Sequence, residues 1–167
     1  MIKRRQFLIF GTLVGISPYI KARELNNFEK AFSEVESTIL AVQEHLFPRD
    51  SKLPFVEEMN STQFLFETMV HQSFDKDIRA FVLEGAKELI RREKGNFVSM
   101  TSINKEKALR AYEDTDYGSS WLSRIMTLTM EGMFSDPIYG GNVKEAGWEA
   151  LHSFGGQPRP RTRYLDV

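Results

Sequence analysis

Residues 28–46 read FEKAFSEVESTILAVQEHL, and this stretch decides the fold. Its apolar side chains recur at intervals of four and three residues, the spacing that places side chains on one side of an α-helix. The stripe consists of Phe28, Phe32, Val35, Ile39, Val42 and Leu46. Pro48 then ends the pattern, because proline cannot continue a helix. The stretch therefore predicts a long helix that buries one face in a core.

Helical patterns also dominate the rest of the chain, and strand signals are few. The further helices are expected to start at residues 60–62, at Asp75, at Asn104 and at residues 118–120, and a short last helix is expected to carry Val143, Trp148 and Leu151. The second helix should reach about Ser73, and Gly95 should end the third. The sequence thus predicts an all-α protein, a single irregular bundle of five to six helices with an extended C-terminal tail.

The charge and the cysteine content exclude several classes of protein. Four of the 22 Lys and Arg residues lie in residues 1–22, which leaves 18 basic against 23 acidic side chains in the other 145 residues, a net charge of −5. A nucleic-acid binder would present a basic face, so no nucleic-acid partner is expected. The chain has no cysteine. It therefore offers no disulfide, no thiolate-bound cluster and no covalent haem site.

The first 22 residues have the pattern of an export signal. Arg4 and Arg5 are followed by Phe7 and Leu8, and a weakly apolar run continues to Ile20. This run is shorter than the about 20 apolar residues that a membrane-spanning helix needs. We interpret residues 1–22 as a twin-arginine signal, an address that a receptor reads on folded proteins, with Ala22 as the candidate last residue before a cleavage site. The alternatives are an ordinary secretory signal, or two chance arginines before a core helix. The expected partner is the twin-arginine translocase, and the expected destination is the periplasm.

The side chains that most often carry chemistry do not assemble into a known catalytic pattern. His45, His71 and His152 do not form the paired Glu-x-x-His motifs of a di-iron bundle. Adjacent carboxylates fall in loops or at helix starts, where acids complement the helix dipole. There is no nucleophile elbow and no glycine-rich dinucleotide loop after a strand. We therefore predict no catalytic, cofactor-binding or metal-binding residue in this chain.

The sequence Asp136-Pro137-Ile138-Tyr139-Gly140-Gly141-Asn142 predicts a tight turn before the last helix. In one interpretation this turn is a scaffold that holds Tyr139 and Trp148 in a fixed relation. In the other, the same residues contact a partner protein. Both interpretations stay open, and we treat the turn residues and Trp148 as interface or scaffold positions.

The tail of residues 157–167 is expected to be extended, because Pro158 and Pro160 prevent a helix at its start. It also carries alternating basic residues and one aromatic residue, which are Arg159, Arg161, Arg163 and Tyr164. One interpretation is a solvated, mobile end. The other is a docking arm that lies on an acidic groove of a partner, with Tyr164 as its anchor.

The stretch Thr129–Gly156, TMEGMFSDPIYGGNVKEAGWEALHSFGG, strongly resembles the gluconate 2-dehydrogenase subunit 3 family. The resemblance is carried by Asp136-Pro137, by Tyr139 through Asn142, and by Gly147-Trp148. Leu46-Phe47-Pro48 with Asp50 also resembles the helix end and the proline-aspartate loop of that family, and the twin-arginine start is similar.

This resemblance implies a small, non-catalytic subunit of a membrane-associated dehydrogenase. It implies a hetero-oligomer in which a large FAD-dependent flavoprotein of the glucose–methanol–choline type oxidises a sugar or sugar acid. A multihaem cytochrome c often receives the electrons, so haem c is expected on that partner and FAD on the large subunit. The small subunit carries the signal and escorts the flavoprotein, and residues 23–156 are its helical domain. The complex is expected at the periplasmic side of the cytoplasmic membrane.

Two other functions remain open at this point. The chain is alternatively a stand-alone periplasmic helical interaction protein. A less favoured alternative is a metal-dependent enzyme that uses His45, His71 and nearby acids. Metal analysis of the purified chain would separate the second alternative from the accessory subunit.

Overall fold

The computed structural model describes residues 18–49, 52–71 and 73–163, and these residues form six α-helices and three short 3-10 helices with no strand. The elements are α1 (Pro18–Leu46), α2 (Ser61–Val70), α3 (Lys76–Arg92), η1 (Phe97–Ser99), α4 (Ser102–Glu113), α5 (Asp116–Phe134), η2 (Pro137–Tyr139), η3 (Val143–Glu145) and α6 (Ala146–Ala150). The predicted all-α fold is confirmed. The predicted signal residues Arg4, Arg5, Phe7 and Leu8 lie outside the described residues, as does Tyr164.

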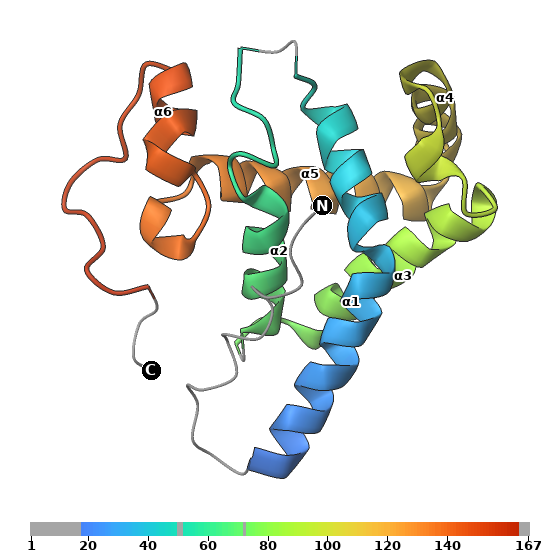
Figure 1. Ribbon diagram of the computed structural model, residues 1–167, viewed down its shortest axis with the longest axis horizontal. Coiled ribbons are helices and arrows are strands. Elements are labelled where there is room, and N and C mark those ends of the chain that lie inside the picture. The colour runs from blue at the N-terminus through green and yellow to red at the C-terminus, as the bar shows by residue number, and fades with distance from the viewer. Residues whose placement is uncertain (1–17, 50–51, 72, 164–167) are drawn as a thin grey trace.

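Helix α5 is the central element of the bundle, since it contacts α1, α2, α3, α4 and α6. In Figure 1 it crosses behind α1 and α2, with α6 near one end and α4 near the other. The C-terminal part of the chain therefore packs against the end of the helix that organises the core. Within the described part of the chain, no helix combines the length and the apolar character needed to cross a membrane.

The apolar stripe of residues 28–46 lines the main core, as its spacing predicts. Phe32, Val35, Ile39 and Val42 are each at most 1% exposed, and they pack with α2, α3 and α5. Helix α1 starts earlier than this stripe, at Pro18. Proline suits the first position of a helix, because the backbone N–H that it lacks would have no hydrogen-bond partner within the helix there. The helix start thus falls inside residues 1–22, which the sequence pattern assigns to the signal.

A buried amide joins three helices at the centre of the bundle. Gln43 of α1 is fully buried, accepts a hydrogen bond from the Thr62 hydroxyl of α2, and donates one to the Thr129 hydroxyl of α5. A buried amide costs free energy unless its polar atoms are paired, and here both are. The three side chains thereby fix the relative register of α1, α2 and α5.

Two predicted helix starts are wrong by two or three residues. Helix α4 begins at Ser102, because Thr101 caps it and the Thr101 hydroxyl accepts from Asn104 N–H. Helix α5 begins at Asp116, because the Thr115 hydroxyl accepts from Gly118 N–H at 3.0 Å. In both cases a capping residue three positions upstream takes the role. The predicted cap at Asp75 is confirmed, since its carboxylate accepts from the N–H groups of Asp77 and Ile78.

The ends of two other helices also differ from the prediction. Helix α2 ends at Val70 rather than near Ser73. The last helix excludes Val143 and Leu151, since it spans only Ala146–Ala150. The φ angles of Lys144 and Glu145 are +58° and +61°, and an α-helix cannot run through residues in this left-handed region. The segment before α6 is therefore a compact turn rather than a helical extension.

Candidate functional site

The predicted turn of residues 136–142 starts with a capped 3-10 helix. The Asp136 carboxylate accepts a hydrogen bond of 3.0 Å from Ile138 N–H, and Pro137 occupies the first position of η2. Gly140 then reverses the chain at φ +99°, a conformation that favours glycine. Asn60, just before α2, donates its side-chain amide to the Gly140 carbonyl at 3.1 Å. The turn is thus tied to the start of α2.

The second glycine of the turn allows close contact with the backbone of α5. A Cβ atom at Gly141 would lie 2.1 Å from the carbonyl oxygen of Gly132, a separation that real atoms do not adopt. The next residue, Asn142, donates its backbone N–H to the same carbonyl at 2.7 Å. Any side chain at position 141 would therefore break the contact between the turn and α5.

Asn142 is the structural centre of the turn. It is fully buried and adopts the left-handed conformation at φ +45°. Its side-chain N–H₂ donates to the Ser135 carbonyl and its side-chain oxygen accepts from Gly147 N–H, both at 2.9 Å. Asparagine suits this position because it tolerates the left-handed region and has both a donor and an acceptor. One side chain thereby joins the end of α5 to the start of α6.

Trp148 anchors α6 against the end of α5. Its ring is buried, with 7% of the residue exposed, and its indole N–H donates to the Phe134 carbonyl at 2.7 Å. The backbone of Gly155 lies directly against this ring, since a Cβ atom there would be 2.1 Å from it. The chain after α6 therefore folds back over the indole.

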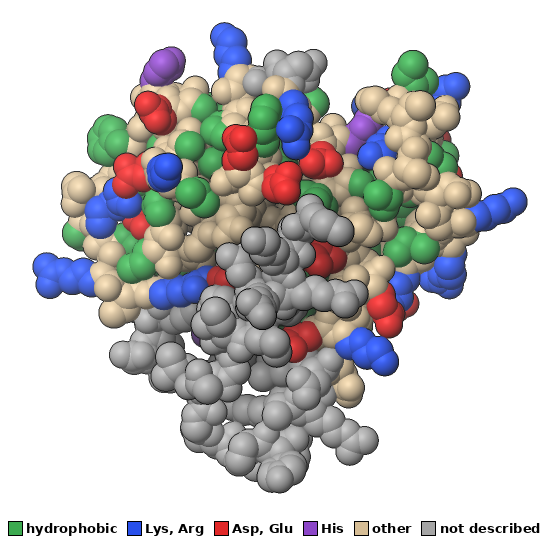
Figure 2. Space-filling view, in the orientation of Figure 1, with side chains coloured by type: hydrophobic (Ala, Val, Ile, Leu, Met, Phe, Trp, Pro, Cys, Tyr) green, Lys and Arg blue, Asp and Glu red, His purple; other side chains and the backbone are tan. Residues whose placement is uncertain are grey.

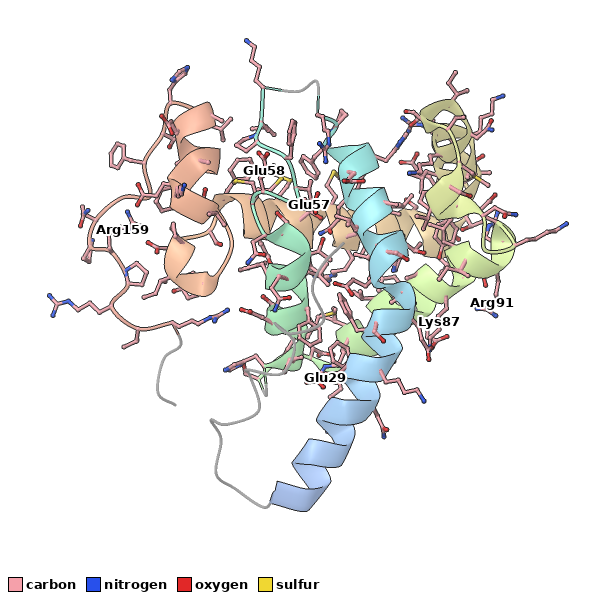
Figure 3. All side chains as sticks on the ribbon, viewed as in Figure 1. Glu29, Glu57, Glu58, Lys87, Arg91 and Arg159 are labelled. Carbon is pink, nitrogen blue, oxygen red and sulfur yellow. The ribbon has the colours of Figure 1, made fainter. Side chains whose placement is uncertain are left out.

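Two arginines of the tail, Arg159 and Arg163, bind the helical domain of the same chain. Arg159 donates to the Asp136 carboxylate at 2.5 Å and to the Glu145 carboxylate at 2.9 Å, and its guanidinium lies 4.7 Å from the centre of the Trp148 ring. In Figure 3 this side chain lies between the tail and the α6 end of the fold. Arg163 donates to the Glu67 carboxylate of α2 and, at 2.9 Å, to the Tyr139 carbonyl. The tail thus bridges the turn and α2.

The contact with Arg159 also lowers the pKa of a carboxyl group in the turn. The hydrogen bond from Arg159 lowers the pKa of Asp136 below its usual value, and the hydrogen bond from Ile138 N–H acts in the same direction. Burial opposes this shift. The carboxylate is therefore ionised at neutral pH and holds both the cap and the tail.

The contacts of the turn stabilise its conformation. The side chains of Asp136, Asn142 and Trp148 all bond to backbone or tail atoms of the same chain. The scaffold interpretation of these positions accounts for each of these contacts. Partner contact by the turn and by the tail stays a prediction, as does a role for Arg161, which is exposed.

The histidines considered for a metal site bind different partners. His45 forms a 2.6 Å hydrogen bond with Glu106 of α4, and this bond, with that of Arg110, lowers the pKa of the Glu106 carboxyl. His71 bonds to Ser73, and His152 is exposed after α6. Among the described residues, no group of three or more His, Asp or Glu side chains could hold a metal ion.

One groove on the described surface lies away from the turn. It has a volume of about 440 Å³ and lies between α3 and the segment that joins α4 to α5. Its lining residues are Glu84, Glu88, Arg91, Arg92, Tyr112, Thr115 and Tyr117. The sequence motif and this groove are therefore separate parts of this chain.

Sequence reasoning missed four residues that complete the site and the fold. They are Gln43, Asn60, Glu67 and Glu145, and each forms a hydrogen bond to a residue 14 to 96 positions away. None stands in a local motif, so no spacing identifies it. One feature of the sequence pointed to Glu67 and Glu145. The three arginines of the tail are strong hydrogen-bond donors, and carboxylates are the acceptors that they bind most strongly.

The comparisons with known proteins identify the family. The model of the gluconate 2-dehydrogenase subunit 3 family matches residues 33–156, which is more than half of the chain. No curated protein and no solved structure gives a match. The match includes α2 to α6 and the whole turn of residues 136–142. The resemblance seen in the sequence is confirmed, and this chain belongs to the gluconate 2-dehydrogenase subunit 3 family.

Proposed function

We propose that this chain is the non-catalytic accessory subunit of a periplasmic, FAD-dependent dehydrogenase of the gluconate 2-dehydrogenase type. The observation that carries the proposal is the family match over residues 33–156. The twin-arginine pattern at Arg4 and Arg5 adds the second element, the export signal of the complex.

The chemistry of the complex is assigned to its other subunits. The large flavoprotein oxidises a CH–OH group of a sugar or sugar acid with its FAD, and a multihaem cytochrome c takes the electrons onward. In this chain the polar groups of the family motif are used in internal hydrogen bonds, from Asp136 to Asn142 and Trp148. These contacts favour a binding and scaffold role over a catalytic one.

The escort role follows from the order of events before export. Flavin is inserted in the cytoplasm, so the large subunit is folded before it crosses the membrane. The twin-arginine route carries folded proteins, and one signal serves a complex that has already assembled. We therefore propose that this chain binds the flavoprotein in the cytoplasm and takes it across the membrane as a passenger.

We further propose that the α6 end of the fold contributes to the interface with the flavoprotein. Leu151, which follows α6 directly, is 55% exposed, and Phe154, three residues further on, is 81% exposed. Figure 2 shows hydrophobic side chains at the surface on this side of the molecule, at the upper left. Contiguous exposed apolar patches mark docking surfaces, and two large exposed apolar side chains within four residues make this end of the fold a candidate for one. Both residues also lie within the matched range.

Co-purification tests this proposal. The chain is tagged at its C-terminus and produced in its native host, and the purified material is examined for a larger subunit, for flavin absorbance and for oxidation of gluconate, glucose, fructose and polyols with an artificial electron acceptor. We expect a stable complex that contains flavin. A chain that purifies alone from cells containing active flavoprotein would contradict the proposal.

The interface is tested with a matched pair of variants. Leu151→Ser combined with Phe154→Ser should reduce recovery of the flavoprotein at least tenfold. Ile103→Ser is the control, because Ile103 is 70% exposed but lies on α4, at the other end of α5. If both variants recover the same amount of flavoprotein, the α6 end is not part of the interface. That result would not affect the proposed accessory role.

A further inference from the structure

The tail contacts define a surface that we name the acidic cradle. It consists of the carboxylates of Glu67, Asp136 and Glu145, the ring face of Trp148 and the backbone carbonyl of Tyr139. We propose that the acidic cradle is an arginine-recognition site, that the chain's own tail occupies it, and that an arginine-bearing segment of a protein partner replaces the tail on assembly.

The first position of the acidic cradle fits the chemistry of a guanidinium group. Arg159 donates from Nε to Asp136 and from a terminal nitrogen to Glu145, while the flat group lies over the ring of Trp148. Several donors in one plane and a face that packs on an aromatic ring are properties of arginine that lysine lacks. The site therefore selects a side-chain type and not only a positive charge.

The second position lies on the other side of Gly140. One terminal nitrogen of Arg163 bonds to both the Glu67 carboxylate and the Tyr139 carbonyl. A Cβ atom on Gly140 would lie 2.9 Å from this nitrogen, so the absence of a side chain there leaves the room that the guanidinium occupies. Between the two positions Arg161 is exposed. The acidic cradle thus recognises two arginines four residues apart in a chain without regular secondary structure.

The acidic cradle and its occupant belong to different parts of the chain. Glu67, Asp136, Tyr139, Glu145 and Trp148 all lie inside the range that matches the family, whereas Arg159 and Arg163 lie beyond it. The recognising surface therefore lies within the matched range, and the tail lies outside it. In this chain the tail acts as an internal ligand for that surface.

The tail is held in a way that allows exchange. Both arginine side chains remain one-third exposed and Glu145 is half exposed, whereas the side chains of Asp136 and Glu67 are 12% and 17% exposed. Water therefore reaches the guanidinium group of each pair and competes for it, which limits the net stability of these ion pairs. A segment of a partner with the same arginine spacing can therefore compete with the tail once its local concentration is high. This proposal goes beyond the accessory role and is tested on the purified chain alone.

Peptide binding to the full-length chain tests the proposal. The probe is a fluorescein-labelled peptide of residues 157–167, QPRPRTRYLDV, and binding is measured by fluorescence anisotropy. The Arg159→Ala/Arg163→Ala double variant frees the acidic cradle and should bind the peptide at least tenfold more tightly than the wild type, in which the tail competes. Arg161→Ala is the matched control, because Arg161 is exposed, and it should behave as the wild type.

Two further measurements establish where the peptide binds. Adding Glu67→Gln and Glu145→Gln to the double variant should return binding to the wild-type level, and a peptide with Lys in place of Arg159 and Arg163 should bind at least fivefold more weakly. Asp136 is left unchanged because it also caps the turn. Should the double variant unfold, the Arg159→Lys/Arg163→Lys variant replaces it and should bind the native peptide more tightly than the wild type.

Two results would overturn the inference. One is equal peptide binding by the wild type and the freed variant, which would mean that the tail does not compete. The other is binding that survives the glutamine substitutions, which would place the peptide elsewhere. Neither result bears on co-purification with a flavoprotein, so the failure of this inference and the failure of the accessory role can be told apart.

Discussion

At the scale of single residues, the motif residues of this chain fix the path of the backbone through the turn. Asp136 caps η2, Gly141 permits contact with Gly132, and Asn142 bonds to both ends of the turn. The sequence predicts a tight turn here, because proline, glycine and asparagine carry turn preferences wherever they stand. It does not predict the partner of each side chain, because Gly132 and Phe134 reach the turn only once α5 has packed.

Asn142 should be the most sensitive position of the turn. Asn142→Ala removes a buried donor and a buried acceptor, leaves the Ser135 carbonyl and Gly147 N–H without this partner, and places alanine at positive φ. We expect a loss of about 2–4 kcal/mol in the free energy of unfolding, measured by urea denaturation.

Asn142→Gly is the control for this variant. Glycine relieves the backbone strain but not the lost hydrogen bonds, so it should recover about 1 kcal/mol of the loss. If Asn142→Ala unfolds at the same urea concentration as the wild type, the central role of this side chain is wrong.

The contact between Asp136 and Arg159 should appear in the pH dependence of stability. The folded pKa of Asp136 lies below its usual value of 3.8, so the ionised form stabilises the fold above about pH 4, and this contribution is lost as pH falls through the folded pKa. Asp136→Asn should therefore destabilise the protein at pH 7 but much less at pH 2.5. Urea midpoints measured from pH 7 to pH 2.5 test this, and a difference that stays constant over the range would contradict it.

At the scale of helices, the sequence predicts faces better than ends. The stripe of residues 28–46 is determined by side-chain spacing alone, and its central residues Phe32, Val35 and Ile39 are buried. The starts of α4 and α5 are misplaced because a threonine stands three residues before each predicted start. Spacing alone does not say which of two capping residues is used, since that choice depends on how the preceding loop enters the helix.

The start of α5 can be tested by substitution. Thr115→Ala removes the hydroxyl that accepts from Gly118 N–H and donates to the Tyr112 carbonyl, and it should cost about 1–2 kcal/mol in the free energy of unfolding. Ser120→Ala, at an exposed position of the predicted start, should change it by less than about 0.5 kcal/mol. If Ser120→Ala destabilises the protein more than Thr115→Ala in thermal or urea unfolding, the helix start predicted from the sequence is the correct one.

At the scale of the whole molecule, the least predictable feature is the path of the tail. Arg163 and Glu67 are 96 residues apart, and no local pattern relates them. The extended character of the tail follows from Pro158 and Pro160, but its place on the domain follows from the acidic cradle, which forms only when α2 and the turn are side by side. The sequence therefore predicts an arm with arginines, whereas its position against the chain's own domain requires the folded structure.

The family match and the helical fold support an accessory subunit of a dehydrogenase complex. That its role depends on export with a flavoprotein partner is our proposal. Such a role predicts that a change in this chain alters the location of a different protein. The large subunit has no need of this chain for its flavin chemistry in our account, so its activity and its location should separate when the signal is inactivated.

Fractionation of cells with an altered signal is the most direct test. Changing Arg4 and Arg5 together to Lys keeps the charge but removes the twin-arginine pair, and Lys3→Arg is the control that leaves the pair intact. We predict that the dehydrogenase activity of the flavoprotein, measured with gluconate, glucose, fructose and polyols, moves from the periplasmic to the cytoplasmic fraction only in the double variant, with the total activity retained. Normal periplasmic activity in that strain would contradict the account.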